Sequence, residues 1–594
     1  MSWLRTHTCG ELTINQKGEE VVLNGWISTR RDLGGLIFID LRDRYGITQI
    51  VFDEKNEKLH SMAEKLRTEY AIGIKGKIIA RDKETINPEM LTGEIEVEVS
   101  DLNVYSKSET PPFEIKDKIA TNEETRLRYR YLDLRRPEMQ KNLILRSEVA
   151  HTIRNFYHNR KFTEVETPVL MRSTPEGARD YLVPSRVNPG RFFALPQSPQ
   201  TYKQILMVSG MDRYFQIVKC FRDEDLRADR QPEFTQVDVE LSFVDEEVIY
   251  ETHEELMAEI WKKHLGVELP LPFSRLTYDQ ALKRYGSDKP DLRFDVELKN
   301  ISDDVADCGF KIFKSTVEKG GHVLSLTVPG QGSLGRGALD RLTKKVTSQT
   351  GAAGMIYMKL ENGEITCSVG KFLDEVTMKN MAETSGAKDG DLVLILAGPA
   401  PRVFHQMGTL RLIVGEEFDL IDKNQTRFLW VTDFPLVEWS KEDLKFHPLH
   451  HPFTAPNPED VDKMDDAPEE VRSRAYDMVL NGNELGGGSI RIHDPEMQQK
   501  MFNILGIGEE EAEEKFGFLL DAFKYGAPPH GGIAFGLDRI IMLMAGAGSL
   551  RDVIAFPKNQ KAQSLMDNSP GTVDEQQLKD LHISLRKSAV KEQS

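Results

Sequence analysis

Cysteine is scarce in this chain, with four residues among 594, and no two of them form a C-x-x-C pair. The four are Cys9, Cys220, Cys308 and Cys367. This spacing argues against a disulfide framework and against a cysteine-ligated structural zinc site, and it is typical of a protein in a reducing compartment. We therefore expect a cytoplasmic protein.

Long apolar runs are also missing. No stretch approaches the roughly eighteen apolar residues that a membrane-spanning helix needs. The N-terminal residues "MSWLRTHTCGELT" contain no apolar core of a signal peptide. The sequence therefore predicts an unexported protein with no membrane partner.

Positive charge is in deficit, with 77 Lys and Arg against 95 Asp and Glu and a net charge of -18. This balance excludes a basic surface over the whole chain, although it leaves room for a local basic face. A polyanionic partner must therefore dock at specific places. With 39% hydrophobic residues, a chain of this length can bury the cores of several domains.

Four signals are absent or fail on inspection. The chain contains no Walker A motif and no H-E-x-x-H. "GQGSLG" (330–335) matches G-x-G-x-x-G, but Pro329 interrupts the preceding strand and no parallel βαβ repeat surrounds it, so we interpret it as a flexible loop. "HPLHHPF" (447–453) has no nearby acidic or cysteine ligands at metal-site spacing, which disfavours a metal cluster.

The first hundred residues predict a small β-rich domain. Short strand patterns at 21–28, 36–42 and 47–52 precede a helical pattern at 56–67, and two more strands follow at 71–80 and 94–105. Three strands, a helix and two strands is the order of a five-stranded OB barrel, which binds oligonucleotides. A generic small barrel is the alternative.

A polar double-proline segment (106–117) then suits a hinge. It is followed by a basic stretch, "EETRLRYRYLDLRRPEMQ". Its arginines have two interpretations, a solvated helix or a phosphate contact. They are Arg126, Arg128, Arg130, Arg135 and Arg136.

The most informative segment is "FRDEDLRADRQPEF" (221–234) and the alternating run after it. Residues 214–222 form a strand pattern, a charged loop follows, and 234–243 returns as a second strand. Alternation places Val237, Val239, Leu241 and Phe243 on one face and polar residues on the other, so we predict an antiparallel hairpin whose polar face is the floor of a site for a charged ligand. The polar face carries Gln236, Asp238, Glu240 and Ser242. A solvent-exposed edge hairpin with salt bridges is the alternative.

This hairpin closely resembles motif 2 of the class II aminoacyl-tRNA synthetases. "GGIAFGLDRIIMLMAG" (531–546) resembles motif 3, and "FTEVETPVL" (162–170) resembles motif 1, which forms the dimer interface. Further segments look like the bacterial-type aspartyl-tRNA synthetases, among them "STPEGARDYLVPSR", "LPQSPQTYKQ", "HHPFTAP" and "NELGGGSIRIH". The resemblance covers essentially the whole chain.

The resemblance implies a multidomain α+β fold. It comprises an N-terminal OB-fold β-barrel and a class II antiparallel-sheet catalytic domain with an inserted α/β domain. The expected boundaries are 1–107 for the anticodon-binding barrel, 108–140 for the hinge, 141–288 and 416–560 for the two catalytic parts, 289–415 for the insertion and 561–594 for a C-terminal extension.

The implied reaction attaches L-aspartate to tRNA through an aspartyl-adenylate, with ATP as substrate and Mg²⁺ as cofactor. Two anions react, so cations and alignment matter more than acid–base groups. Arg222, Glu484 and Arg539 are the expected catalytic residues, with Glu484 holding Mg²⁺. The expected ATP-binding residues are Arg222, Asp223, Glu224, Gln231, Phe234, Glu484, Gly536, Leu537, Asp538 and Arg539.

The implied aspartate pocket pairs the substrate carboxylate with Lys203 and Arg491. An amide in its place would leave both cations unpaired, which is how a polar site rejects an isostere. The remaining aspartate-binding residues implied by the resemblance are Glu176, Ser198, Gln200, Arg222, Asp238 and His450.

The resemblance also implies partners. Phe38 would stack on an anticodon base and Gln49 would bond a base edge, although the strand pattern alone favours the barrel core for Phe38. The tRNA would be tRNA(Asp), joined in one of two kinds of enzyme by tRNA(Asn), and a homodimer would form around Pro168. Three alternatives are a non-catalytic RNA-binding relative, a tRNA-independent amide ligase, and a sibling enzyme for asparagine or lysine.

Overall fold

The computed structural model describes residues 2–174, 178–224 and 230–586. The chain divides into two compact units. Unit 1 comprises Met1–Glu148, Leu226–Gln231 and Ala545–Asp574, and unit 2 comprises Val149–Asp225, Pro232–Met544 and Glu575–Ser594. Each unit is described by itself.

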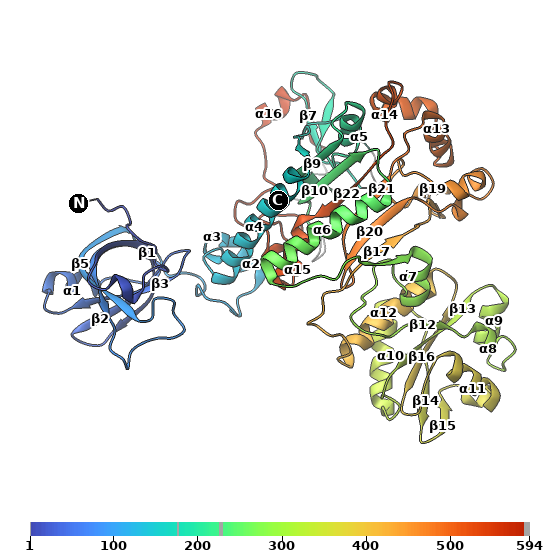
Figure 1. The fold of residues 1–594 in the computed structure, drawn as a ribbon, viewed down its shortest axis with the longest axis horizontal. Coiled ribbons are helices and arrows are strands. Elements are labelled where there is room, and N and C mark those ends of the chain that lie inside the picture. Colours follow the sequence, from blue (N-terminus) through green and yellow to red (C-terminus); the bar gives the residue numbers. More distant parts are fainter. Residues whose placement is uncertain (1, 175–177, 225–229, 587–594) are drawn as a thin grey trace. The chain divides into compact units, whose positions relative to one another are not determined.

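Unit 1 contains a closed five-stranded barrel with strand order β1-β2-β3-β5-β4 (blue in Figure 1). The predicted order of strands and helix is confirmed. On β2 the side chains of Ile37, Ile39 and Leu41 are fully buried, whereas Phe38 between them is only half-buried and lies on the outer face. The elements are β1 (Glu20–Asp32), β2 (Leu36–Arg42), β3 (Ile47–Asp53), α1 (Glu57–Ala63), β4 (Ala71–Ala80) and β5 (Ile95–Ser106), preceded by a short 3-10 turn, Ile14–Gln16.

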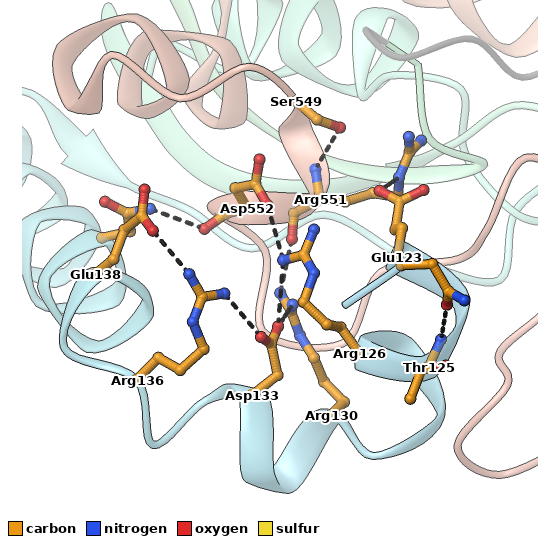
Figure 2. A network of polar contacts seen from close by, with 12 residues as sticks. Glu123, Thr125, Arg126, Arg130, Asp133, Arg136, Glu138, Ser549, Arg551 and Asp552 are labelled. Carbon is orange, nitrogen blue, oxygen red and sulfur yellow. Dashed lines mark hydrogen bonds and ion pairs between the residues drawn. The ribbon is translucent and has the colours of Figure 1, made fainter. Parts of the chain in front are cut away.

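The basic stretch after the barrel forms the short helices α2 (Glu123–Arg128) and α3 (Arg130–Asp133) and the start of α4 (Pro137–Asn159). Figure 2 shows its polar network. The fully buried Asp133 accepts hydrogen bonds from Arg130 Nη1 at 2.5 Å and from Arg136 Nη1 at 2.9 Å.

Arg130 also donates to main-chain oxygens of the segment that follows α15. Its Nη2 lies 2.6 Å from the carbonyl oxygen of Arg551 and 2.7 Å from that of Ile554. Both interpretations of the basic stretch are therefore wrong for Arg130 and Arg136, because these two side chains are buried and ion-paired inside the protein. A carboxylate three residues away on a short helix, and carbonyls from a distant segment, are partners that spacing alone does not reveal.

Unit 2 is built on an eight-stranded sheet with the order β11-β17-β20-β21-β22-β10-β9-β6. The two edge pairs, β11 with β17 and β6 with β9, are parallel, and the inner pairs are antiparallel. The strands are β6 (Thr163–Glu164), β9 (Arg213–Phe221), β10 (Glu233–Ser242), β11 (Ser274–Thr277), β17 (Phe428–Thr432), β20 (Ala475–Leu480), β21 (Asn483–Ile490) and β22 (His530–Gly536).

Helices accompany this sheet. α6 runs across it in Figure 1, and its buried side chains include Ile249, Leu256 and Ile260 at helical spacing. α15 follows β22 directly. The helices are α5 (Gln200–Val208), α6 (Glu246–Leu265), α7 (Tyr278–Tyr285), α13 (Pro495–Ile504), α14 (Glu509–Phe523) and α15 (Leu537–Ala545), with α16 (Glu575–Asp580) near the C-terminus.

Residues 289–415 form a second sheet with the order β12-β13-β16-β14-β15, in which every pairing is antiparallel. The absence of a parallel repeat around 330–335, on which we rejected a dinucleotide site, is confirmed for this sheet. Its elements are β12 (Leu298–Asn300), α8 (Ser302–Val305), α9 (Lys311–Glu318), β13 (His322–Val328), α10 (Arg336–Thr350), β14 (Ile356–Glu361), β15 (Glu364–Cys367), α11 (Glu375–Thr384), β16 (Leu392–Gly398) and α12 (Arg402–Glu417).

Two small hairpins complete unit 2, β7 (Leu182–Pro184) with β8 (Phe192–Ala194) and β18 (Val437–Ser440) with β19 (Lys445–Pro448). Within the described ranges, no helix is both long enough and apolar enough to span a bilayer.

Candidate active site

The predicted hairpin is present as β9 and β10, and β22 pairs with β10 on its other side. Its polar face is buried. Asp238 and Glu240 are 0% exposed and Ser242 is 7% exposed, so the interpretation as a solvent-exposed edge hairpin is wrong. A buried charge must be paired or it destabilises the fold, so the partners of these carboxylates define the site.

Lys203 supplies the first partner. It lies on α5, its side chain is 1% exposed, and its Nζ is 2.9 Å from Asp238 Oδ1 and 3.2 Å from Glu240 Oε2. The helix thus projects one ammonium group onto the polar face of β10.

Arg491 supplies the second partner, immediately after β21. Its Nε and Nη2 donate to the two carboxylate oxygens of Glu240 at 2.9 and 3.0 Å. Its remaining terminal nitrogen, Nη1, donates to Ser489 Oγ at 2.7 Å and lies 2.5 Å from Nε2 of His451. This two-pronged geometry fixes the guanidinium plane.

The charges in this cluster set the protonation of its carboxylates. Burial alone would raise the pKa of Glu240, but the charges of Arg491 and Lys203 outweigh it and hold the pKa at about 2. For Asp238, burial dominates over the attraction of Lys203 and raises the pKa. Glu240 is therefore the fixed anion that holds both cations in place.

Two adjacent histidines face the same cations. Burial, reinforced by the charge of Arg491, lowers the pKa of His450 to about 4 and that of His451 well below its ordinary value. Both rings are therefore neutral near pH 7. A neutral His451 can accept the hydrogen bond from Arg491, which a protonated ring cannot.

Glycine at 532 lets β22 approach this cluster. A Cβ at Gly532 would stand 2.1 Å from Glu240 Oε2 and 2.1 Å from the main-chain oxygen of Val239. Only a residue without a side chain fits between the strand and the carboxylate.

Arg222 follows β9 directly. Its main-chain N–H donates to the carbonyl oxygen of Pro232 at 2.9 Å, and its guanidinium lies 5.2 Å from the centre of the Phe234 ring. Nε of Arg222 is buried without a hydrogen-bond partner among the described residues. Arg222 and Phe234, both expected to bind ATP, therefore lie against each other.

The strand-to-helix junction at 536–539 adjoins the start of β10. Asp538 Oδ2 accepts a hydrogen bond from the Thr235 main-chain N–H at 2.7 Å, and Arg539 Nη1 donates to the carbonyl oxygen of Glu484 at 2.6 Å. A Cβ at Gly536 would make only ordinary contacts, at 3.7 Å or more, so the folded chain itself does not require glycine there. Leu537, the first residue of α15, is buried.

Two carboxylates gather beside Gly487. A Cβ on that glycine would lie 2.4 Å from Asp477 Oδ1 and 4.0 Å from Glu484 Oε1, so both side chains project from β20 and β21 to the same place. Burial, together with the charges of Glu484 and Asp288, raises the pKa of Asp477 well above its ordinary value, and its Oδ1 has no hydrogen-bond partner in the described chain.

This pair fits a divalent cation that also binds substrate phosphates. Mg²⁺ typically takes one or two protein carboxylates and completes its shell with phosphate oxygens and water. Across the described ranges, no group of three or more His, Cys, Asp or Glu residues is arranged to hold a metal by itself. The donor set at Asp477 and Glu484 therefore suits a metal that arrives with a nucleotide.

The start of α5 adds polar groups to the site. Gln200 and Thr201 are buried, and both Gln200 Nε2 and Thr201 Oγ1 lack a hydrogen-bond partner among the described residues. Ser198 lies two residues before the helix and is half-buried. The two unpartnered groups of Gln200 and Thr201 are costly to bury, which favours a polar ligand at this position.

Three further expected residues are outside the cluster described above or outside the described residues. Glu176 falls outside the described residues. Gln231 belongs to unit 1, where its side chain makes two hydrogen bonds to the main chain of Lys558, at 3.0 and 2.8 Å. Gln49, in the barrel, accepts from Arg31 at 2.9 Å and donates to Glu96 at 2.6 Å.

Our assignment of residues from the sequence missed several members of the cluster. Alternation puts Glu240 on the polar face without indicating a role for it, and neither the patterns nor the resemblance point to His451, Ser489 or Asp477. Alternation with Asp238 was a usable signal for Glu240. Ser489 and His451 are found only once the fold brings β21 and the 447–453 loop together.

Comparison with known families gives two matches. A family model described as tRNA synthetases class II (D, K and N) matches residues 122–560, and one described as OB-fold nucleic acid binding domain matches residues 21–105. The second match, with the closed barrel, favours the OB interpretation over a generic barrel.

Several curated relatives match nearly end to end. An aspartate–tRNA(Asp/Asn) ligase from Salinibacter ruber is 56% identical and covers 98% of this chain and 94% of the relative. Another with the same name, from Thermoanaerobacter sp., is 52% identical, and an aspartate–tRNA ligase from Ruminiclostridium cellulolyticum is 53% identical, with 98% of both chains covered in each case.

Solved structures share the fold at lower identity. An asparaginyl-tRNA synthetase from Pyrococcus horikoshii, complexed with asparaginyl-adenylate, has a TM-score of 0.59 at 19% identity and covers 93% of this chain and 98% of that one. A putative aspartyl-tRNA synthetase from Leishmania major has a TM-score of 0.58 at 19% identity, with 94% and 95% covered. The expected fold class is confirmed, and the chain belongs to the class II tRNA synthetases of the D, K and N group.

Proposed function

We propose that this protein attaches L-aspartate to tRNA in two ATP-dependent steps. The observation that carries the proposal is the pair of buried cations, Lys203 and Arg491, held on either side of Glu240. A pocket with two fixed cations suits a ligand with a carboxylate side chain. The names of the relatives from Salinibacter and Thermoanaerobacter support aspartate as that ligand.

Aspartate selection would follow from these two cations. The substrate side-chain carboxylate bonds to Arg491 and Lys203, whose orientations Glu240 and Asp238 already fix. Asparagine would leave part of this positive charge unpaired, and lysine would add a third cation. We assign the α-ammonium and the remaining polar atoms of the substrate to Ser198, Gln200, His450 and Glu176.

In the first step, an oxygen of the aspartate α-carboxylate attacks the α-phosphorus of ATP. The bond from that phosphorus to the bridging oxygen breaks, and pyrophosphate leaves. Arg222 would bridge the two anions, Phe234 would stack on adenine, and Arg539 would hold the polyphosphate. Asp223, Glu224, Gln231, Gly536, Leu537 and Asp538 are proposed as further ATP contacts.

Asp477 and Glu484 would hold Mg²⁺. The bound metal would supply charge neutralisation at the phosphates. The two carboxylates orient toward one point next to Gly487, and they repel each other until a cation is present.

In the second step, a ribose hydroxyl at the 3′-terminal adenosine of tRNA attacks the activated carbonyl. The ester bond forms and AMP leaves with its phosphate, which takes the displaced proton. The barrel would bind the anticodon through Phe38, whose ring lies on the outer face of β2, and through Gln49. We propose tRNA(Asn) as a second acceptor beside tRNA(Asp).

A homodimer and the domain boundaries are part of the same proposal. The dimer contact would include the segment around Pro168, where Val169 is 48% and Leu170 is 50% exposed. Residues 1–107 would bind the anticodon, 108–140 would be the hinge, 141–288 and 416–560 would form the catalytic domain, 289–415 would be an insertion and 561–594 a C-terminal extension.

The alternatives fit less well. A non-catalytic relative would not need Arg222, Glu484 and Arg539 at these positions. A tRNA-independent amide ligase would not need an anticodon-binding barrel. A lysine enzyme would not place Lys203 and Arg491 in its side-chain pocket.

The test is aspartate-dependent exchange of pyrophosphate into ATP, followed by charging of purified tRNA(Asp) and tRNA(Asn) with labelled aspartate. We expect exchange with aspartate and not with asparagine, and charging of both tRNAs. Lys203→Gln should abolish exchange, whereas Lys262→Gln, at an exposed position on α6, should not. Exchange with asparagine alone, or no charging of either tRNA with ATP and Mg²⁺ present, would overturn the proposal.

A further inference from the structure

Unit 1 contains a cavity of about 530 Å³ on the barrel. This volume is in the range of pockets that hold a small organic ligand. Its lining combines arginines with aromatic rings, in a chain whose net charge is -18. The residues that matter here are Arg5, Trp26, Arg42, Arg44, Tyr45 and Arg135, which together we name the arginine pocket.

The carboxylates near this pocket do not neutralise it. Asp43 is 8% exposed, and its oxygens accept hydrogen bonds from the main-chain N–H groups of Cys9, Tyr45 and Gly46 at 2.9, 2.8 and 3.1 Å. Its nearest arginine, Arg5, is 3.8 Å away. Asp43 therefore mainly shapes the turn between β2 and β3.

The other neighbouring acid is shared by two arginines. Glu69 accepts from Arg42 Nη2 at 2.8 and 2.9 Å and from Arg135 Nη1 at 2.7 Å. Four arginines thus face two carboxylates, and the pocket has an excess of positive charge.

Two of these arginines can still bind an anion. Arg42 is 6% exposed, yet its Nη1 is buried without a hydrogen-bond partner among the described residues. Leaving a charged donor unpaired is costly, and a bound anion would remove that cost. Arg44 is exposed, and within the described chain its contact is with a ring and not with a carboxylate.

The rings are arranged to take a planar group beside the charges. The guanidinium groups of Arg44 and Arg5 lie 4.9 and 5.6 Å from the centre of the Tyr45 ring, and that of Arg135 lies 4.8 Å from the Trp26 ring. Tyr45 is 47% exposed. Exposed aromatic rings next to arginines are the elements with which proteins stack nucleic-acid bases and bind the attached phosphates.

The pocket lies on the same barrel strands as the proposed anticodon residues, but further along them. Arg42 and Phe38 are four residues apart on β2 and so share its outer face, roughly 13 Å from each other. Phe38 pairs with Arg31 and Arg42 pairs with Trp26, so the two positions lie toward opposite ends of the β1–β2 pair.

We propose that the arginine pocket binds one nucleotide of the tRNA outside the bases that Phe38 and Gln49 read. Arg44, Arg5 and Nη1 of Arg42 hold the phosphate, and the base stacks on Tyr45. This inference rests on the proposed function, because it makes the barrel's RNA surface longer than the anticodon contacts alone.

The test uses the full-length protein and two kinds of variant. Arg44→Glu reverses the charge in the pocket, and Lys58→Glu makes the same charge change at an exposed position of α1 on the same barrel. Tyr45→Ala removes the ring, and Tyr45→Phe keeps it. All four substitutions are at exposed positions. A thermal melt checks that each variant is folded.

We expect Arg44→Glu and Tyr45→Ala each to weaken tRNA binding in a filter assay about tenfold, with Tyr45→Phe and Lys58→Glu close to the parent. For Arg44→Glu, the slope of the logarithm of the tRNA binding constant against the logarithm of the salt concentration should decrease in magnitude by about one. Aspartate-dependent pyrophosphate exchange, which needs no tRNA, should be unchanged in all variants.

Equal tRNA affinity for Arg44→Glu and Lys58→Glu would overturn the proposal. So would a change in exchange activity without tRNA, because it would indicate that the pocket serves a free nucleotide instead. Failure of the parent protein to catalyse exchange would count against the proposed function. The filter assay would still show whether the arginine pocket binds tRNA.

Discussion

Nη1 of Arg491 lies 2.5 Å from Nε2 of His451, while Nε and Nη2 of the same guanidinium both donate to Glu240. One arginine thus has a carboxylate on one edge and a neutral ring on the other. The ring stays neutral because burial and the arginine's own charge lower the pKa of His451.

Replacing His451 tests this pair. His451→Phe removes the acceptor opposite Nη1, and we expect the KM for aspartate in pyrophosphate exchange to rise by roughly 10-fold, with a smaller change in the KM for ATP. His451→Gln keeps an acceptor oxygen and should recover most of the loss. An unchanged KM in His451→Phe would show that the ring does not position Arg491.

Asp477→Asn should have opposite effects on stability and activity. The carboxylate is destabilised by burial and by Glu484, so the amide should maintain or raise the melting temperature without Mg²⁺ and ATP. Adenylate formation should fall about 100-fold and need more Mg²⁺. Asp462→Asn, at an exposed position, is the control and should change neither quantity. A lower melting temperature in Asp477→Asn would contradict the predicted repulsion.

Gly532→Ala should disturb the cation cluster. Its Cβ would stand 2.1 Å from Glu240 Oε2, so Glu240 must move away from Arg491 and Lys203. We expect a loss of about 2 kcal/mol or more in the free energy of unfolding and a higher KM for aspartate. Gly354→Ala, where a Cβ meets open space, is the matched control for a urea titration. Equal urea midpoints for Gly532→Ala and Gly354→Ala would show that β22 accommodates the added methyl group without strain.

Acid should destabilise the protein through His253. This ring is fully buried in α6, and burial lowers its pKa to about 4 although its Nδ1 contacts the Ile249 carbonyl oxygen. Between the ordinary histidine pKa and 4 the unfolded chain binds a proton that the folded protein does not. The contribution of neutral His253 to the free energy of unfolding is therefore complete above about pH 6.5 and is lost as the pH falls toward 4. The loss is about 3 kcal/mol.

His253→Gln should reduce this pH dependence in urea titrations from pH 7 to 4.5 by the share of one buried histidine, because the lowered pKa values of His450 and His451 also contribute to it. His405→Gln, at an exposed position of α12, should leave the dependence as in the parent. If the free energy of unfolding changes with pH by the same slope in the parent and in His253→Gln, His253 is protonated in the folded protein.

The strand pattern of the barrel and the β9–β10 hairpin could be predicted because each depends on local alternation and on turn residues. Asp238 on the polar face follows from period-two counting, whereas the pattern alone favours the barrel core for Phe38, which the structure places on the outer face. The resemblance to synthetase motifs located Lys203 and Arg491, which alternation alone does not connect.

Other features depend on contacts between distant segments. Arg130 and Arg136 look like surface cations in the sequence, but Asp133 and the carbonyls near 551–555 surround them in the structure. The role of Glu240 likewise requires a helix and a strand that lie far away in the chain. Local periodicity carries no information about such partners.

The strand order of the unit 2 sheet has a consequence for biosynthesis. β10 lies between β9 and β22, yet β22 begins at His530, and Glu240 is separated from Arg491 by 251 positions. At about 5–20 residues per second, a ribosome needs roughly 15–60 s between β10 and β22. During that interval Lys203, Asp238 and Glu240 lack the neighbours that bury them, so the centre of the catalytic sheet is among the last parts of the nascent protein able to fold.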